Sequence, residues 1–252
     1  MDILELCDIN RAFGGLRAVC DLCIGVKENK ITALIGPNGA GKTTAFNLIT
    51  GVFPATSGKV MYGGKNITNL PPYRIASLGI ARTFQNVRIF GNMTALENVM
   101  IGLHTRTHKG LLSSAFRTPS SKKEEKYIRE EAFTYLEFME LGNLAGKSAS
   151  SLAFGQQRIL EIARALAMKP KLLHLDEPAA GLNSQETLKL GEVIKKILDS
   201  GITVFIVEHD MELVMNISHS VVVLNNGKLI AHGTPSEVQK NSDVINAYLG
   251  ED

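Results

Sequence analysis

One segment of the chain has the composition and spacing of a site that binds nucleotide phosphates. A glycine, four further residues, a second glycine, a lysine and a threonine follow one another as Gly36, Pro37, Asn38, Gly39, Ala40, Gly41, Lys42 and Thr43. Glycines let successive backbone N–H groups face one anion, and a following helix adds the positive end of its dipole. Lys42 would then reach the terminal phosphates, and the Thr43 hydroxyl would bind Mg²⁺. This segment, extended by Thr44, predicts that the chain binds a nucleoside triphosphate such as ATP.

Acidic, imidazole and amide side chains follow other apolar segments. Lys171–Leu175 leads directly into Asp176 and Glu177. Buried strands rarely end in an acidic pair without a cation or a reaction to serve. His209 and Gln85 likewise stand at the ends of predicted strands. These residue types could hold a metal ion, activate water and contact a phosphate.

The elements around these residues predict an α/β core. Ile31–Ile35 is apolar and β-branched at both ends, which is typical of a buried strand, and Thr44–Ile49 favours a helix that ends near Gly51. An ordinary glycine-rich turn is the alternative interpretation of the loop between them, and this strand-loop-helix context disfavours it. Ligands of open α/β sheets lie beyond the carboxyl ends of the strands, so we expect these groups to converge on one phosphate.

A mostly helical lobe is expected between residues 92 and 154. Lys123–Leu141 has the apolar spacing of a long amphipathic helix, and a further helix opens at Ser151 and runs to Met168. The polar, basic stretch 104–126 is typical of a solvated loop. A docking surface for a partner or for acidic lipid headgroups is the alternative.

The two ends of the chain predict β structure around this core. Residues 1–30 favour short strands, and Lys59–Tyr62 another β segment. Phe13 could pack in the core or offer its ring to a nucleotide base. Val221–Leu224 and Leu229–Ala231 predict a hairpin, followed by a helical tail.

Composition narrows the function classes. The chain has 252 residues, 44% apolar and 21% charged, enough for one large domain with an inserted lobe. Its net charge of +2 does not favour a nucleic-acid partner. The acidic start lacks the basic charge of an export signal, and no apolar stretch approaches the roughly 18 residues of a membrane span. We therefore expect any work at a membrane to proceed through partners.

The three cysteines, Cys7, Cys20 and Cys23, do not form a disulfide framework, because their number is odd. Cys20 and Cys23 form a C-x-x-C pair, but residues three apart on a strand point to opposite faces. No second pair completes a zinc site. We expect the cysteines to pack as small, buried apolar residues, in a protein of the reducing cytoplasm.

Taken in order, these motifs resemble the ATP-binding-cassette ATPase family over nearly the whole chain. The resemblance implies that Asp176 holds Mg²⁺ and that Glu177 is the general base that polarises the attacking water. It implies that Gln85 senses Mg²⁺ and links the site to transmembrane partners. His209 matches the histidine that contacts the γ-phosphate, and Phe13 the aromatic that stacks on adenine.

Two positions depart from the family pattern. Where the family usually has Leu-Ser-Gly-Gly-Gln, this chain has Leu152 followed by Ala153, Phe154, Gly155 and Gln156. The serine hydroxyl is absent, but the glycine and the helix start remain, so backbone N–H groups could meet a γ-phosphate across a dimer. Asn183 stands where an aspartate is usual.

Within the family, the chain looks most like the ATPase subunits of branched-chain amino acid importers. That similarity rests on three segments: Arg82–Gln85, the alanine and aromatic residue at Ala153 and Phe154, and the tail Val244–Leu249. The alternatives are the ATPases of urea importers, of other amino acid importers and of lipopolysaccharide export, because their sequences are similar. A phosphate-loop kinase is a further alternative, but a kinase would not need the segment Ser151–Gln157, which we call the signature segment. A soluble protein that acts on ribosomes or DNA is the last alternative. Such proteins of this family usually carry two cassettes in one chain or a long coiled coil, and this sequence predicts neither.

The resemblance also implies an architecture and an assembly. It implies a phosphate-loop NTPase core of RecA-like type with an antiparallel β subdomain and an inserted α-helical subdomain. Residues 1–252 would form one cassette domain, with 1–91 and 155–252 as the core and 92–154 as the helical subdomain. Implied partners are transmembrane permease subunits, a second ATPase subunit in a hetero- or homodimer and, indirectly, a periplasmic or extracellular solute-binding protein. The chain would lie peripherally on the cytoplasmic face of the plasma (inner) membrane.

Overall fold

The computed structural model describes residues 1–104 and 119–249, which form two compact units. The first unit comprises Met1–Arg82 and Lys171–Asp252, and the second comprises Thr83–Pro170. The second unit includes more residues than the helical lobe expected at 92–154, because helix α6 (Phe154–Ala167) packs on α3 (Ala95–His104) and α5 (Pro119–Phe138). Each unit is described by itself below.

A six-stranded sheet forms the centre of the first unit. Its strand order is β10-β9-β3-β8-β7-β6, and all neighbours are parallel except the antiparallel pair β10-β9. Every residue of β3, β7 and β8 is buried, as expected for parallel strands covered on both faces. The strands are β3 (Ile31–Ile35), β6 (Ile80–Arg82), β7 (Leu172–Asp176), β8 (Thr203–Val207), β9 (Ser220–Asn225) and β10 (Lys228–Gly233).

A second, antiparallel sheet has the order β2-β1-β4-β5. The expectation of short strands at the N-terminus is wrong, because β1 and β2 each run for 12 residues. Their register shifts several times, and Asp8 and Asp21 take positive φ values of 49° and 45°. Such bulges let a strand continue past irregular positions. The strands are β1 (Asp2–Phe13), β2 (Leu16–Lys27), β4 (Ser57–Tyr62) and β5 (Lys65–Asn66).

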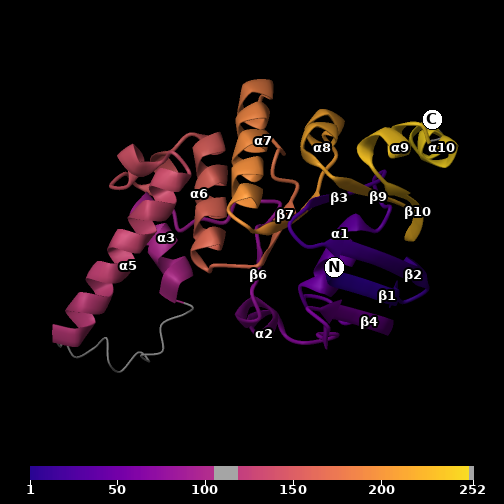
Figure 1. Cartoon of the computed structure of the whole chain (residues 1–252), viewed down its shortest axis with the longest axis horizontal. Helices are drawn as coiled ribbons and strands as arrows, with labels where there is room; N and C mark the ends of the chain where they lie inside the picture. The colour runs from indigo at the N-terminus through magenta and orange to yellow at the C-terminus, as the bar shows by residue number, and fades with distance from the viewer. Residues whose placement is uncertain (105–118, 250–252) are drawn as a thin grey trace. The chain divides into compact units, whose positions relative to one another are not determined.

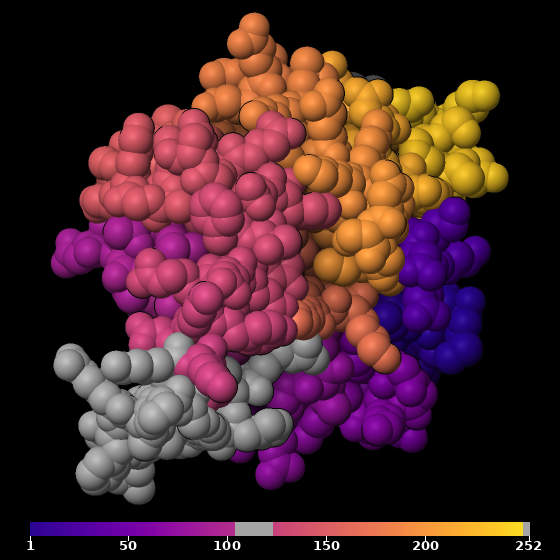
Figure 2. Space-filling model, turned by 60° about the vertical axis from the view of Figure 1, so that its left-hand side comes forward, coloured from indigo at the N-terminus to yellow at the C-terminus, as the bar shows by residue number. Residues whose placement is uncertain are grey.

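Helices cover the six-stranded sheet on both faces. Figure 1 shows α1 on the side of the antiparallel sheet, and α7 and α8 on the opposite side. Helix α1 contacts both β2 and β8, and its Phe46 is fully buried in the core between the two sheets. At the surface, the yellow C-terminal helices lie beside the orange α7–α8 segment (Figure 2). The helices are α1 (Lys42–Ile49), α2 (Pro72–Ser77), α7 (Ser184–Asp199), α8 (Met211–Ile217), α9 (Pro235–Gln239) and α10 (Ser242–Leu249).

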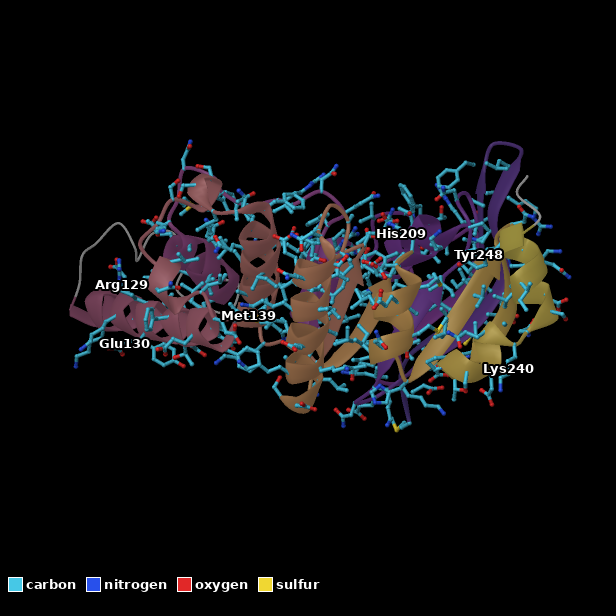
Figure 3. The ribbon with its side chains drawn as sticks, turned by 90° about the horizontal axis from the view of Figure 1, so that it is seen from above. Arg129, Glu130, Met139, His209, Lys240 and Tyr248 are labelled. Carbon is cyan, nitrogen blue, oxygen red and sulfur yellow. The ribbon has the colours of Figure 1, made fainter. Side chains whose placement is uncertain are left out.

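The second unit is helical, with α3 and α6 packed on each other and on α5. Helix α5, on which Figure 3 labels Arg129 and Glu130, begins at Pro119. Residues 119–126 of the polar stretch are therefore helical rather than a loop. Proline favours the first turn of a helix, which explains the earlier start. Residues 105–118 of that stretch lie outside the described residues.

Two further expectations concern single features. Cys20 is buried and Cys23 is exposed, as predicted for residues three apart on a strand, and both are free thiols. The expectation of buried cysteines is wrong for Cys23, whose Sγ donates to Asp8 Oδ1 at 3.1 Å, and Cys7 is only half-buried. Among the described residues, no helix combines the length and the apolar character needed to cross a membrane.

Candidate functional site

The loop between β3 and α1 has a backbone path that only glycine permits at two positions. A Cβ on Gly36, where φ is 148°, would lie 2.1 Å from the carbonyl oxygen of Leu224. A Cβ on Gly41, where φ is 97°, would lie 2.5 Å from the carbonyl oxygen of Ala18. The loop is thus pressed against neighbouring backbone, so that it turns sharply before α1.

Lys42 lies over this loop at the start of α1. Its Nζ donates to the carbonyl oxygens of Gly36 at 2.6 Å and of Pro37 at 2.8 Å. The side chain is 93% buried, since its exposed fraction is 7%, whereas Thr43 beside it is exposed. A buried ammonium group, a helix N-terminus and an accessible hydroxyl together suit phosphate oxygens and a divalent cation bound to them.

Asp176 ends β7 and is held by an arginine. Arg82 Nη2 lies 3.6 Å from Asp176 Oδ2, and Arg82 Nη1 donates to Asn47 Oδ1 at 3.1 Å and to Thr50 Oγ1 at 2.7 Å. This cation joins β6, α1 and β7 behind the phosphate loop. Asp176 is 4% exposed, and a carboxylate at the end of a parallel strand is a ligand of the type that Mg²⁺ uses. The sequence showed Arg82 as part of a motif, but not this contact.

Glu177 and His209 lie close together at the ends of adjacent strands. His209 Nδ1 is 3.9 Å from Glu177 Oε2, and the side chain of His209 is 62% exposed against 17% for Glu177. Glu177 takes a left-handed backbone conformation with φ 44°, and its N–H donates to the carbonyl oxygen of Val207 at 2.8 Å. Figure 3 shows His209 just before helix α8. A carboxylate and an imidazole at this spacing could bind one water between them.

Glu208, the neighbour of His209, is a buried group that the sequence did not single out. It is 0% exposed and accepts hydrogen bonds from backbone N–H groups of two loops. The sequence shows Glu208, His209 and Asp210 together at the end of this strand, but it does not show the direction in which each side chain points.

Phe13 lies at the turn between β1 and β2 and not in the buried core. Its exposed fraction is 39%. The edge of its ring meets Phe53 with 5.3 Å between centroids, and the guanidinium carbon of Arg11 lies 4.4 Å from its centroid. The ring is thus partly packed against its neighbours and partly accessible, and its stacking on a base stays a prediction.

The other predicted site residues belong to the second unit. Gln85 is exposed, and its carbonyl oxygen accepts from Arg158 Nη2 at 2.8 Å. Helix α6 begins at Phe154, which is 47% exposed, and the Ala153 N–H donates to Gln156 Oε1 at 3.2 Å. The glutamine thus supplies one half of a capping box, and the alanine side chain offers no acceptor to the first turn of α6. The expected approach of Gln85 to the phosphate loop stays a prediction.

Asn183 supplies a physical account of one departure from the family pattern. Its Oδ1 accepts from the Glu186 N–H at 3.0 Å, and its own N–H donates to Glu186 Oε2 at 3.0 Å, so it caps α7. Asparagine and aspartate are about equally good at this position. The capping role survives the exchange.

Comparison with known proteins gives two family matches. A model described as "ABC transporter" matches residues 20–180, and one described as "Branched-chain amino acid ATP-binding cassette transporter" matches residues 228–252. A high-affinity branched-chain amino acid transport ATP-binding protein of Pseudomonas aeruginosa, BraF, is 46% identical over 250 residues, covering 99% of this chain and 98% of that protein. The Escherichia coli K12 protein LivG, described in the same words, is 43% identical over 250 residues, with the same coverage.

Solved structures agree in fold along the entire chain. A nucleotide-free ATP-binding cassette from an ABC transporter superposes with a TM-score of 0.87 at 36% identity, and 100% of each chain is covered. The ADP conformation of an ATP-binding cassette gives the same TM-score, identity and coverage.

Proposed function

The chain belongs to the ABC transporter family, and on that premise we propose that it is the ATP-hydrolysing subunit of a branched-chain amino acid importer. Membership makes it an ATPase built on the phosphate-loop fold predicted from the sequence. The observation that carries the choice of solute is 46% identity along nearly the whole length of a relative described as serving branched-chain amino acid transport. The separate match at residues 228–252 supports the same subgroup.

Nucleotide binding is assigned to the loop and to Phe13. The N–H groups of the loop hold the phosphates, and the Lys42 ammonium exchanges its carbonyl partners for phosphate oxygens. Thr44 follows at the start of α1, where a further N–H adds to the cradle. Phe13 stacks on the base, for which its partly exposed ring is suited. The set comprises Gly36, Pro37, Asn38, Gly39, Ala40, Gly41, Lys42, Thr43 and Thr44.

Hydrolysis is assigned to the residues at the strand ends. Glu177 accepts a proton from water as the water oxygen attacks the γ-phosphorus, and the bond to the ADP oxygen breaks. His209, 3.9 Å from that carboxylate, orients the γ-phosphate. Thr43, Asp176 and Gln85 would hold Mg²⁺, which when bound neutralises charge on the phosphate oxygens.

The assembly completes the site. We propose that the whole chain forms one cassette domain and that Ala153, Phe154, Gly155 and Gln156 of one subunit close the phosphate site of another. Permease subunits would dock near Gln85 and the helical unit. Family membership supports partners in a membrane. A peripheral position on the cytoplasmic face of the plasma (inner) membrane, with an external solute-binding protein acting through the permease, follows from this proposal.

The test is solute uptake by the reconstituted transporter. The complex is purified through a tagged permease, with this chain and any second ATPase subunit, and is placed in proteoliposomes with a solute-binding protein outside and ATP on the cassette side. We expect ATP-dependent uptake of leucine, isoleucine and valine, and none with Glu177→Gln. Uptake of urea in place of these amino acids would overturn the solute, and ATP hydrolysis with no import at all would overturn the importer.

A further inference from the structure

The carboxylate of Glu208 is buried where no lysine or arginine pairs with it among the described residues. It follows β8, and its exposed fraction is 0%. His209 Nδ1 lies 3.8 Å from Oε2. A buried carboxylate is costly unless its oxygens are hydrogen-bonded, so the use of these oxygens determines what Glu208 does.

Its two oxygens hold two different loops. Oε1 accepts from the Ala179 N–H at 2.7 Å, in the loop that follows Glu177. Oε2 accepts from the N–H groups of His209 at 2.9 Å and Asp210 at 3.1 Å, in the loop after β8. One side chain therefore ties the backbone next to the carboxylate of the site to the backbone that carries the histidine.

Both tied loops have conformations that need support. Glu177 lies in the left-handed region with φ 44°, which a residue with a side chain adopts only when its surroundings enforce it. Its N–H bond to the Val207 carbonyl oxygen fixes one end, and the Ala179 bond to Glu208 fixes the other. Beyond His209, Asp210 caps α8 by accepting from the Leu213 N–H at 2.9 Å, which holds the second loop.

We propose that Glu208 is a positioning residue for ATP hydrolysis: it sets the spacing between Glu177 and His209. This inference rests on the proposed roles of those two residues. Glu208 is fully buried, so it acts through these two residues and not by contact with the nucleotide. A carboxylate is required because both oxygens must accept, whereas an amide of the same shape accepts through one oxygen only.

The test is Glu208→Gln in the full chain, which keeps size but replaces one acceptor by a donor that faces an N–H group. A misplacement of about 1 Å can lower a rate about 10²-fold, so we expect kcat for ATP to fall about 10- to 100-fold while KM stays near the wild-type value. Glu237→Gln is the matched control, because Glu237 Oε2 also accepts from a backbone N–H, that of Thr234 at 2.7 Å, at the start of α9. It should leave kcat unchanged.

A second measurement separates positioning from mere stability. If Glu208 acts by placing the histidine, Glu208→Gln should lower kcat much less in a His209→Ala background than in the wild type. Equal losses in both backgrounds, or a lowered melting temperature with unchanged kcat, would overturn the proposal. If Glu208→Gln does not fold, Glu208→Asp undergoes the same two measurements with the same criteria. Wild-type turnover in Glu177→Gln would instead refute the assigned site.

Discussion

Lys42 carries the positive charge of the phosphate loop, and Lys42→Ala should weaken ATP binding about tenfold to more than a hundredfold. Loss of a charge-assisted hydrogen bond is worth roughly 1.5–3 kcal/mol. The loop backbone should persist, because the Ala40 N–H donates to the Pro37 carbonyl oxygen and the Gly227 N–H donates to that of Ala40. Titration calorimetry measures the affinity, and wild-type affinity in this variant would refute the phosphate-loop assignment.

Phe13 tests how the base is held. Phe13→Ala should weaken ATP binding by about 1–3 kcal/mol, the range of base–aromatic stacking, with a small change in melting temperature. Phe13→Tyr should be mild. Leu16→Ala is the control, since Leu16 is 69% exposed at the same turn. A sharply lower melting temperature with unchanged affinity would return Phe13 to a packing role.

His174 makes the fold sensitive to acid. The ring is fully buried beside Phe46 and Phe205, and its two nitrogens have no hydrogen-bond partner within the described residues. Burial, with a smaller contribution from the charge of Arg82, lowers the pKa of His174 from 6.5 to about 3. Between these values the unfolded chain binds a proton that the folded chain excludes, so stability is lost as pH falls from 6.5 towards 3.

His174→Leu should remove this loss. Relative to wild type, the free energy of unfolding of the variant should gain about 2 kcal/mol more at pH 5 than at pH 7.5. Urea unfolding at the two pH values measures it. The exposed His232, changed to Gln, is the control and should alter the pH dependence less. An equal effect of His174→Leu at both pH values would contradict the pKa shift.

At the scale of elements, helix α6 holds the segment around Gln85 through one buried arginine. Arg158 Nη1 donates to the carbonyl oxygen of Phe84 at 2.8 Å and lies 3.2 Å from Glu161 Oε2. Glu161 Oε1 accepts from the Arg88 N–H at 3.2 Å. Burial raises the pKa of Glu161 despite these partners. The signature helix and the glutamine segment therefore share one buried ion pair.

Arg158→Met should destabilise the chain by about 3–5 kcal/mol, because it leaves Glu161 buried without its cation. Adding Glu161→Met should recover much of that loss. Lys126→Met removes an exposed pair with Glu130 and should change stability by less than about 1 kcal/mol. Chemical denaturation measures all three. A small effect of Arg158→Met alone would contradict the role of the pair.

The sequence predicted the elements whose signals are local and missed those that depend on distant partners. Strand β7 and the phosphate loop were predicted because apolar runs and glycine spacing need no partner to be recognised. Arg158 was missed because a cation in an amphipathic helix is normally assigned to the surface. Glu208 was missed because its hydrogen bonds reach Ala179, in another loop. The length of β1 was missed because bulges interrupt its alternation.

At the scale of the whole molecule, we expect the working transporter to contain two different ATPase chains. The phosphate loop lies in the first unit and the signature segment in the second, and we propose that the two meet across a dimer. The likeness to branched-chain amino acid importers is the reason to expect that these two chains differ. The complex should be purified through a tagged permease in mild detergent, and its ATPase chains counted by native mass spectrometry.

One copy of this chain with one other cassette is the expected result. Two copies with no second cassette would establish the homodimer instead. Absence of any permease association would refute the transporter function, whatever the ATPase activity of the isolated chain.

The left-handed backbone of Glu177 has a consequence for how the sequence can drift. At φ 44° a glycine would be unstrained, whereas a residue with a Cβ is strained by about 1–3 kcal/mol. A selection that rewarded only thermal endurance would therefore replace this glutamate. Libraries screened for heat resistance should enrich glycine or asparagine at position 177, and the winners should be inactive as ATPases. The most stable descendants of this protein would thus have lost their function at that residue.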